Sequence, residues 1–240
     1  MKGLQLIIKG NWGHFKKPET DNNPISYDFI TKPALIGLIG AVIGIDRNEM
    51  RPLFPQLSDD LLYGVQVLNP VKKISIAFTL RKAVKLSEKA PKHMEFLKSP
   101  KFLVAIALHN SRSKKQFDEF AQAIKNSESK FTPVLGLHNC PANLEFISEG
   151  NFSEKLTDNG TWFKIKCFIS KNHILDMKNT ENFCIRPAQI PTFQNDDFWN
   201  PPDKNIDVIY PSEDKEITVK GDYYKYYTDE ETNGGLWWLI

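Results

Sequence analysis

The chain has 240 residues, of which 41% are hydrophobic and 25% are charged, and its 31 basic and 29 acidic side chains leave a net charge of +2. This composition is ordinary for a globular protein and excludes a wholly disordered or fibrous chain. The longest apolar run, residues 34–45, is shorter than the roughly 20 residues that a membrane-spanning helix needs. We therefore expect no contact with a membrane.

The near-neutral total hides an uneven distribution of charge. Residues 1–139 carry 21 basic and 12 acidic side chains, a net of +9, whereas residues 140–240 carry 10 basic and 17 acidic side chains, a net of −7. Such an asymmetry between halves indicates a surface that faces a polyanion, although charges also scatter unevenly by chance.

The cysteines indicate a reducing compartment and no zinc site. Cys140, Cys167 and Cys184 are few, odd in number and form no C-x-x-C pair. No secretory segment precedes the first strand-like residues, so we expect a cytoplasmic protein. The five histidines are scattered, and no two of them stand at the spacing of metal ligands. We predict neither a metal nor a cofactor.

Four stretches of the first half are expected to be strands. Residues 4–8, 74–80 and 102–108 have alternating apolar positions, which predicts strands, and residues 61–69 are a further candidate. A further short strand is expected at 131–137.

Two amphipathic helices are expected between these strands. The first begins at Thr31, whose side chain can cap it, and Pro33 fits its first turn because the amide that proline lacks would be unpaired there. The second follows Ser111 or Ser113. Residues at i, i+3, i+4 and i+7 predict the buried stripes, which are Leu35, Leu38, Ile39 and Val42, and then Phe117, Phe120, Ala121 and Ile124.

The resulting order is βαββαβ, which is the ferredoxin-like pattern that RNA-recognition modules also use. We predict an α+β fold with this domain at residues 1–139. An insertion at residues 70–100 lies where a hairpin would normally turn. From Lys72 to Lys101 it holds nine basic and two acidic side chains. This predicts a basic arm that projects from the sheet, with a solvated loop as the alternative.

Residues 140–240 are expected to form a β-rich C-terminal portion. The candidate strands are 143–147, 161–169, 183–190, 206–210 and 216–227, with turns at 157–160 and 200–203. The tail at 236–240 is too apolar for a solvated end. We expect it to pack on the fold or to be covered by a partner.

Two loops and one helix contain the candidate binding residues. The loop around residues 11–18 mixes aromatic and basic side chains, which can stack bases and pair with phosphates, although its aromatic residues can equally be core anchors. The helix after it has glycines at Gly37, Gly40 and Gly44, which suggest close approach by a strand of the sheet or by a nucleic-acid backbone. Gly136 leaves the expected strand at 131–137 and opens a second, polar loop.

No catalytic motif is present in the sequence, which lacks a nucleophile elbow, a phosphate-binding loop and a zinc-protease pattern. A metal-independent ribonuclease could still be assembled by general acid–base chemistry from His14, Tyr27, Lys82 and His93. Nothing in the sequence places these four residues together.

Three stretches closely resemble the N-terminal signature of one family. They are WGHFKKP at 12–18, PISYDF at 24–29 and TKPALIGLIGAVIG at 31–44, and the family is the CRISPR-associated RAMP subunit that caps the 5′ handle of the guide RNA in type I Cascade complexes. The signature looks most like the type I-B branch. The stretch LGLHNCPA at 135–142 is similar to the glycine loop of that family, although members often carry a basic residue near position 137, where this chain has leucine.

The resemblance implies a RAMP version of the RNA-recognition fold, in which the insertion at 70–100 is the thumb. It also implies three macromolecular partners, which are the 5′ handle of the crRNA, the Cascade backbone subunit and the large subunit, with target DNA reached only indirectly. In most type I systems a separate endonuclease cuts the precursor RNA, so the resemblance implies a non-catalytic subunit in antiviral defence. In the type I-C branch the corresponding subunit cuts the RNA itself.

The sequence and the resemblance together give a set of candidate RNA contacts. These are His14, Lys16, Lys17, Tyr27, Lys32, Arg81, Lys82, His138 and Asn139. Phosphate contacts would supply affinity and unstacked handle bases specificity. Two alternatives remain open, a metal-independent endoribonuclease that processes repeat RNA and a β-rich scaffold that binds only protein through its apolar tail.

Overall fold

The computed structural model describes residues 1–240 except 21–22, 82–88, 180–183, 198–201, 203 and 229–234. The strands of its first half are β1 Lys2–Lys9, β2 Trp12–Gly13, β3 Leu61–Val67, β4 Lys73–Arg81, β5 Lys89–Lys98 and β6 Lys101–Leu108. The α-helices are α1 Lys32–Ile43, α2 Arg47–Asp60 and α3 Lys114–Lys125, which follows a 3-10 turn at Ser111–Ser113. The later strands are β7 Asn143–Phe152, β8 Leu156–Ile165, β9 Ile169–Ser170, β10 Ile174–Leu175, β11 Ile185–Phe193, β12 Lys204–Pro211, β13 Ile217–Tyr227 and β14 Leu236–Trp237, with a 3-10 turn at Met177–Asn179 between β10 and β11.

Four antiparallel strands in the order β7-β1-β6-β3 form the centre of the largest sheet. This is the strand order of a ferredoxin-like fold, so the predicted α+β class is confirmed. The fourth strand of the motif is β7, and the strand predicted at 131–137 is wrong. Val134 makes only an isolated bridge to Pro141, because Pro133 lacks an amide and Gly136 has a positive φ of 89°. The sheet therefore continues past residue 139.

The apolar stripes of the two predicted helices face the core. All eight residues of the stripes are buried. Thr31 and Ser113 stand at the N-cap positions, but neither side chain bonds to its own helix. Ser113 instead donates to Asp60 Oδ2 at 2.6 Å.

Helix α2 was not expected from the sequence, because Pro52 and Pro55 lie inside it and each proline disfavours a helix interior. Asp46 offsets part of that cost by accepting hydrogen bonds from the backbone amides of Asn48 and Glu49. Met50, which is buried, then packs against α1.

The strands expected in the second half are present, with shifted ends. β8 and β14 pair with β13, and β11, β12 and β9 form a separate three-stranded sheet. The turn predicted at 157–160 is wrong, because these residues lie within β8. Of the turn predicted at 200–203, only Pro202 lies within the described residues.

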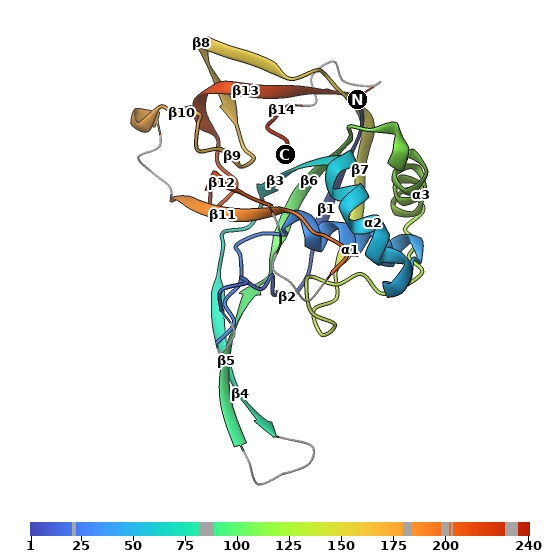
Figure 1. Cartoon of the computed structure of the whole chain (residues 1–240). Helices are drawn as coiled ribbons and strands as arrows, with labels where there is room; N and C mark the ends of the chain where they lie inside the picture. The colour runs from blue at the N-terminus through green and yellow to red at the C-terminus, as the bar shows by residue number, and fades with distance from the viewer. Residues whose placement is uncertain (21–22, 82–88, 180–183, 198–201, 203, 229–234) are drawn as a thin grey trace.

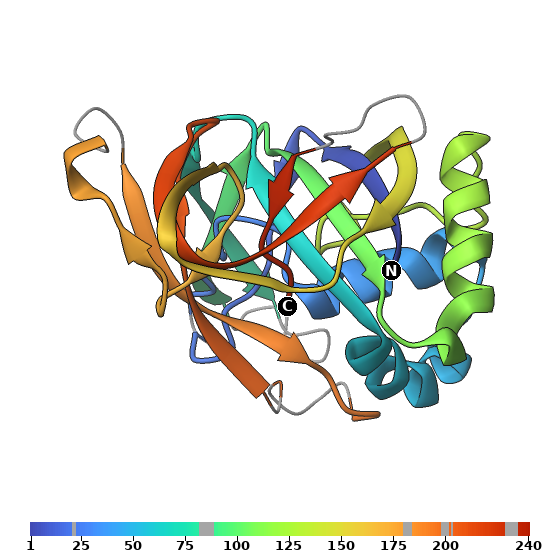
Figure 2. The ribbon, with the colours of Figure 1, turned by 90° about the horizontal axis from the view of Figure 1, so that it is seen from above.

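The apolar tail packs on the fold. Trp237, Trp238 and Leu239 are buried, and Ile240 exchanges two backbone hydrogen bonds with Tyr63 of β3, at 2.9 and 3.0 Å. Figure 2 shows the α-helices on one side of the central sheet and β8, β13 and β14 on the other. The tail therefore fills the space between the sheet and the C-terminal strands, and the scaffold hypothesis loses the surface on which it depended.

The insertion at 70–100 is a long hairpin of β4 and β5 that projects from the body of the molecule, as predicted (Figure 1). At its base β2 joins as a third strand, with Trp12 opposite Lys98. None of the helices in the described part of the chain has the length and apolar character that a membrane crossing requires.

Candidate nucleic-acid interface

The loop between β1 and α1, residues 11–31, folds back on itself at the base of the hairpin. The backbone amide of Lys17 donates to the carbonyl of Ile25 at 3.0 Å, and the amide of Tyr27 donates to that of Phe15 at 2.8 Å. The Ser26 hydroxyl accepts from the amide of Phe15 at 2.9 Å and donates to the carbonyl of Tyr27 at 2.7 Å. We call residues 11–31 the signature loop. Hydrogen bonds at its neck set its geometry, and Lys16, Glu19 and Ile25 beyond the neck are exposed.

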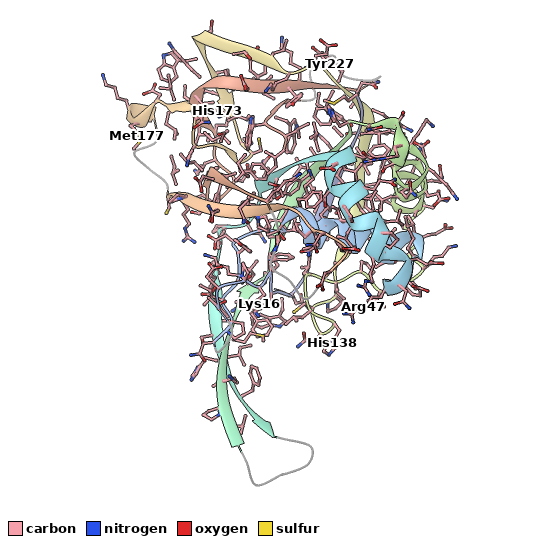
Figure 3. All side chains as sticks on the ribbon, in the orientation of Figure 1. Lys16, Arg47, His138, His173, Met177 and Tyr227 are labelled. Atoms are coloured by element: carbon pink, nitrogen blue, oxygen red, sulfur yellow. The ribbon has the colours of Figure 1, made fainter. Side chains whose placement is uncertain are left out.

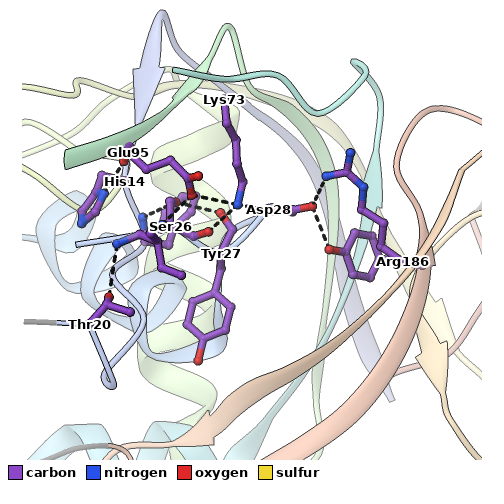
Figure 4. Close-up of polar contacts among 11 residues, drawn as sticks. His14, Thr20, Ser26, Tyr27, Asp28, Lys73, Glu95 and Arg186 are labelled. Atoms are coloured by element: carbon purple, nitrogen blue, oxygen red, sulfur yellow. Dashed lines mark hydrogen bonds and ion pairs between the residues drawn. The ribbon is translucent and has the colours of Figure 1, made fainter. Parts of the chain in front are cut away.

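Asp28 connects the signature loop to the hairpin and to the C-terminal portion (Figure 4). Its Oδ1 lies 2.7 Å from Nζ of Lys73 at the start of β4. Its Oδ2 accepts from Arg186 of β11 at 2.7 Å and from the hydroxyl of Tyr210 of β12 at 2.9 Å. Lys73 also lies 2.9 Å from Glu95 Oε1 on β5. Three separate segments of the chain thus meet at one carboxylate.

The charge state of Asp28 follows from these partners. Burial favours the neutral acid, but the hydrogen bonds from Lys73, Arg186 and Tyr210, with the charge of Lys73, together hold the pKa of Asp28 below its usual value. The pKa of the Tyr210 hydroxyl is shifted upward, because burial and the neighbouring charge of Asp28 both disfavour its ionised form. At neutral pH Asp28 is therefore an anion and Tyr210 a donor.

Three of the predicted contacts with RNA are buried. His14, Tyr27 and Lys32 are 2%, 6% and 4% exposed. Nδ1 of His14 donates to the carbonyl of Glu95 at 2.7 Å, and burial lowers the pKa of His14 while it raises that of Tyr27 to about 12. Burial also lowers the pKa of Lys32 to about 8. These residues shape the site from beneath and offer little surface to a ligand.

The polar loop at residues 134–142, which we call the glycine loop, is packed against the signature loop. The amide of His14 donates to the carbonyl of Leu135 at 2.9 Å. A side chain at Gly136, whose φ is 89°, would overlap the carbonyl oxygen of His14. Gly136 is therefore a true close-approach glycine, and its neighbour across the contact is the signature loop.

Four predicted contacts lie at this junction with surface available. Lys16, His138 and Asn139 are exposed, and Lys17 is half-buried with its Nζ 5.5 Å from the centre of the Tyr27 ring. Figure 3 shows Lys16 and His138 on the side of the body from which the hairpin projects. These residues belong to two loops that are about 120 positions apart in the sequence and that contact each other through their backbones.

The remaining predicted positions differ in what surrounds them. Arg81 pairs with Lys89 near the end of the hairpin, and Lys82 lies outside the described residues. A side chain at Gly37 would make only ordinary contact with Phe54, at 3.7 Å.

Gly40 and Gly44 are both tightly approached, and the neighbours belong to the protein. A side chain at Gly40 would lie 2.6 Å from Sδ of Met50, and one at Gly44 would lie 2.6 Å from Cδ of Lys130. Neither a strand nor a nucleic acid is needed to explain them.

The hairpin has two chemically different faces. Residues that pair directly across two strands share a face, and Ile74 pairs with Phe96 while Ile76 pairs with Met94. Ile74 and Ile76 are 42% and 38% exposed. The opposite face carries Lys73, Ser75, His93 and Glu95. The apolar face is unusual for a hairpin that stands away from the core.

Sequence reasoning missed Lys73, Glu95, Arg186 and Tyr210, and it gave Asp28 no role. The pairing of Asp28 with Arg186 and Tyr210 spans 158 and 182 positions, and neither pairing belongs to a local motif.

Of the four residues of the ribonuclease alternative, His14 and Tyr27 are buried, His93 is exposed on β5, and Lys82 lies outside the described residues. Within the described ranges no three histidine, cysteine or acidic side chains are grouped as a metal site would need. The exposed candidate groups of the two loops are lysine, imidazole and amide side chains.

The fold and this junction define a ferredoxin-like module with a projecting hairpin and an added β-rich portion. A family model described as CRISPR-associated protein (Cas_Cas5) matches residues 3–182. The match covers most of the chain, so the protein belongs to this CRISPR-associated family. A comparison with curated protein sequences gave no match.

Two solved structures have a similar fold. One, described as a CRISPR RNA-guided surveillance complex, is 12% identical with a TM-score of 0.57 and covers 90% of this chain and 91% of its own. The other, a CRISPR protein from Archaeoglobus fulgidus, is 12% identical with a TM-score of 0.58 and covers 99% of this chain and 98% of its own. At this identity the likeness extends to the fold, and it includes the C-terminal portion that the family model leaves unmatched.

Proposed function

We propose that this protein is a non-catalytic crRNA-binding subunit of a type I Cascade effector, of the I-B branch, and that it caps the 5′ handle of the guide RNA. The observation that carries the proposal is the junction of the signature loop and the glycine loop. The two loops contact each other through the backbones of His14 and Leu135, and between them they carry Lys16, Lys17, His138 and Asn139, which are two ammonium groups, an imidazole and an amide. Such groups suit phosphates and the edges of unstacked bases.

The family match supports this reading, since it covers both loops and the hairpin. The buried residues His14, Tyr27 and Lys32 then have a supporting part, because they fix the backbone that presents the exposed ones. We propose Lys16, Lys17, His138 and Asn139 as the direct contacts, and retain Arg81 and Lys82 as contacts made by the hairpin.

A salt titration of handle-RNA binding tests the proposed contacts. The double variant Lys16→Ala/Lys17→Ala is expected to weaken binding and to reduce the slope of log affinity against log salt by about 0.7 for each lost phosphate contact. Lys114→Ala/Lys115→Ala is the matched control, because it removes two adjacent exposed lysines from the start of α3. An unchanged slope in the first variant would refute the site.

Absence of catalysis is tested separately. We expect purified protein to leave repeat RNA intact in EDTA, whereas site-specific cleavage would establish the endoribonuclease alternative. In that case His14→Ala and His93→Ala would show which imidazole takes part, because the first is buried and the second is exposed.

The apolar face of the hairpin supports an assembly role. We propose that the Cascade backbone subunit covers Ile74 and Ile76, which would remove two exposed apolar side chains from water. Ile76→Glu is expected to abolish copurification with that subunit. Ala77→Glu, at the next and oppositely facing position, is expected to preserve it, and equal loss in both variants would count against a face-specific contact. Contact with the large subunit, and through it with target DNA, completes the proposed assembly.

A further inference from the structure

A second basic surface lies on the other flank of the hairpin base. It is an open groove of about 440 Å³ where β1 ends and β6 and β7 begin. Lys9, Lys101, Asn11, Asn69 and Asn143 line it, and no acidic side chain does. We call it the thumb-base groove. Asn11 of the signature loop lines it, but none of the candidate RNA contacts named above does.

The strand register explains why the two lysines face the groove together. Lys9 is directly opposite Lys101 on one side and opposite Asn143 on the other. Directly paired residues of antiparallel strands share a face, with Cβ atoms about 5 Å apart, and like charges in this arrangement are destabilising. The sheet thus holds two cations side by side at its end.

Only one of these cations is neutralised. Lys9 Nζ lies 3.0 Å from Glu145 Oε2. Lys101 forms no ion pair with any residue that the structure describes. A groove that keeps an uncompensated lysine beside a second lysine is suited to an anion, because the anion would offset the repulsion between them.

The amides of the groove add hydrogen-bonding capacity at a fixed place. Nδ2 of Asn69 donates to the carbonyl of Ser99 at 2.9 Å, and the amide of Ser99 donates to the carbonyl of Asn11 at 2.8 Å. These bonds tie the wall of the groove together across three segments. One N–H of Asn69 and the side chain of Asn143 stay available to acceptor oxygens.

The shape favours a chain over an isolated ion. The groove is open to solvent, and Pro141 and Ala142 of the glycine loop form part of its wall. The two surfaces are therefore joined through one loop, which carries His138 and Asn139 two to three residues before Pro141.

We propose that the thumb-base groove binds the phosphodiester backbone of the guide RNA, through Lys101 and Lys9, as a second contact continuous with the handle site. This inference rests on the proposed function. It adds a phosphate contact at residues outside the signature, and it predicts that Glu145 weakens RNA binding by competing for Lys9.

The test uses the full-length protein, a handle-containing RNA and a duplex DNA of equal length, with affinity measured over a range of salt concentrations. Lys101→Gln is expected to lower RNA affinity about threefold near physiological salt and to reduce the RNA slope by about 0.7, the value for one phosphate contact with a single strand. Lys101→Arg should restore both. Lys115→Gln, which removes an exposed lysine of α3, is the control and should change neither.

Glu145→Gln gives a test of opposite sign. It frees Lys9 without removing a basic group, so RNA affinity should rise, which general damage to the fold would not produce. Thermal unfolding of each variant checks that the fold is intact.

The outcomes separate the two proposals. If Lys101→Gln has no effect on RNA affinity while Lys16→Ala/Lys17→Ala weakens it, the proposal that the groove binds RNA is wrong and the proposed handle site stands. If Lys101→Gln weakens only DNA binding, the assignment to RNA is overturned. If neither variant changes RNA binding, both proposals fail.

Discussion

Arg186 on β11 donates a hydrogen bond to Asp28 of the signature loop at 2.7 Å, across 158 positions of sequence. The same carboxylate binds Lys73, at the root of the hairpin, at 2.7 Å. The loop that presents the candidate RNA contacts is therefore held between the hairpin and the C-terminal portion. This arrangement gives the β-rich portion a role in positioning the site, which its acidic composition did not suggest.

We expect Asp28→Asn to destabilise the protein by about 3 kcal/mol, at the lower end of the range for breaking a buried ion pair, because Lys73 and Arg186 remain partly solvated. Asp207→Asn is the matched control. It breaks an exposed pair with Lys171 and should destabilise the protein much less than Asp28→Asn. Urea unfolding measures both, and equal effects would contradict the structural role of Asp28.

The stability of the protein in acid should depend on the ionisation of Asp28. The pKa of Asp28 is lower in the folded protein than its usual value, so its ionised form contributes stability above the unfolded value of about 3.9. That contribution is lost as the pH falls through the lower, folded pKa. The free energy of unfolding of the wild type should therefore fall more steeply below about pH 4 than that of Asp28→Asn. Parallel pH profiles would show that Asp28 is not ionised selectively in the folded state.

The charged form of Lys32 should destabilise the folded protein, in contrast to that of Asp28. Burial lowers its pKa to about 8, below the unfolded value of about 10.4, so the unfolded chain binds more protons between these values. Stability should consequently rise as the pH increases from about 8 to about 10.4. Lys32→Met should remove this rise and stabilise the protein at pH 7 by roughly 2 kcal/mol. A loss of stability would indicate a compensating partner for the ammonium group.

The sequence predicted the parts of the fold that depend on regular apolar spacing. The apolar residues of β1 and β6 follow the two-residue period of a strand, and those of α1 and α3 follow the 3.6-residue period of a helix. All four elements are present. Helix α2 escaped prediction because Pro52 and Pro55 oppose a helix locally and packing outweighs them. The strand expected at 131–137 does not form. Its apolar residues are typical of a strand, but Pro133 and Gly136 disfavour one locally.

The candidate site was predictable only in part, because a motif identifies a segment without showing which side chains reach the surface. The signature pointed to the correct loop, yet Lys32 within it is buried and Lys16 is exposed. The contacts of Asp28 depend on tertiary pairing between β4, β11 and β12. No spacing rule along the sequence encodes such a pairing.

Gly37 of α1 and Gly136 of the glycine loop should respond oppositely to alanine. Gly37 lies inside α1 with room for a methyl group, so Gly37→Ala should stabilise the protein by about 1 kcal/mol. Gly136 has a φ of 89°, and a side chain there meets the backbone of His14. Gly136→Ala should cost at least about 1–2 kcal/mol for the left-handed conformation alone and should weaken handle-RNA binding. Thermal unfolding and the RNA titration measure the two effects, and RNA binding that survives Gly136→Ala would separate the two loops functionally.

The apolar tail should matter for folding rather than for a partner. Trp238 is 7% exposed, and its ring packs edge-on against Phe168 and His173. Trp238→Ala should cost about 3–5 kcal/mol, the usual cost of removing a buried large aromatic side chain. Trp162→Ala is the control, since Trp162 is 44% exposed on β8 and its loss should have a much smaller effect. Urea unfolding distinguishes them. If Trp238→Ala left stability unchanged and removed only the capture of a protein partner, the scaffold reading of the tail would be restored.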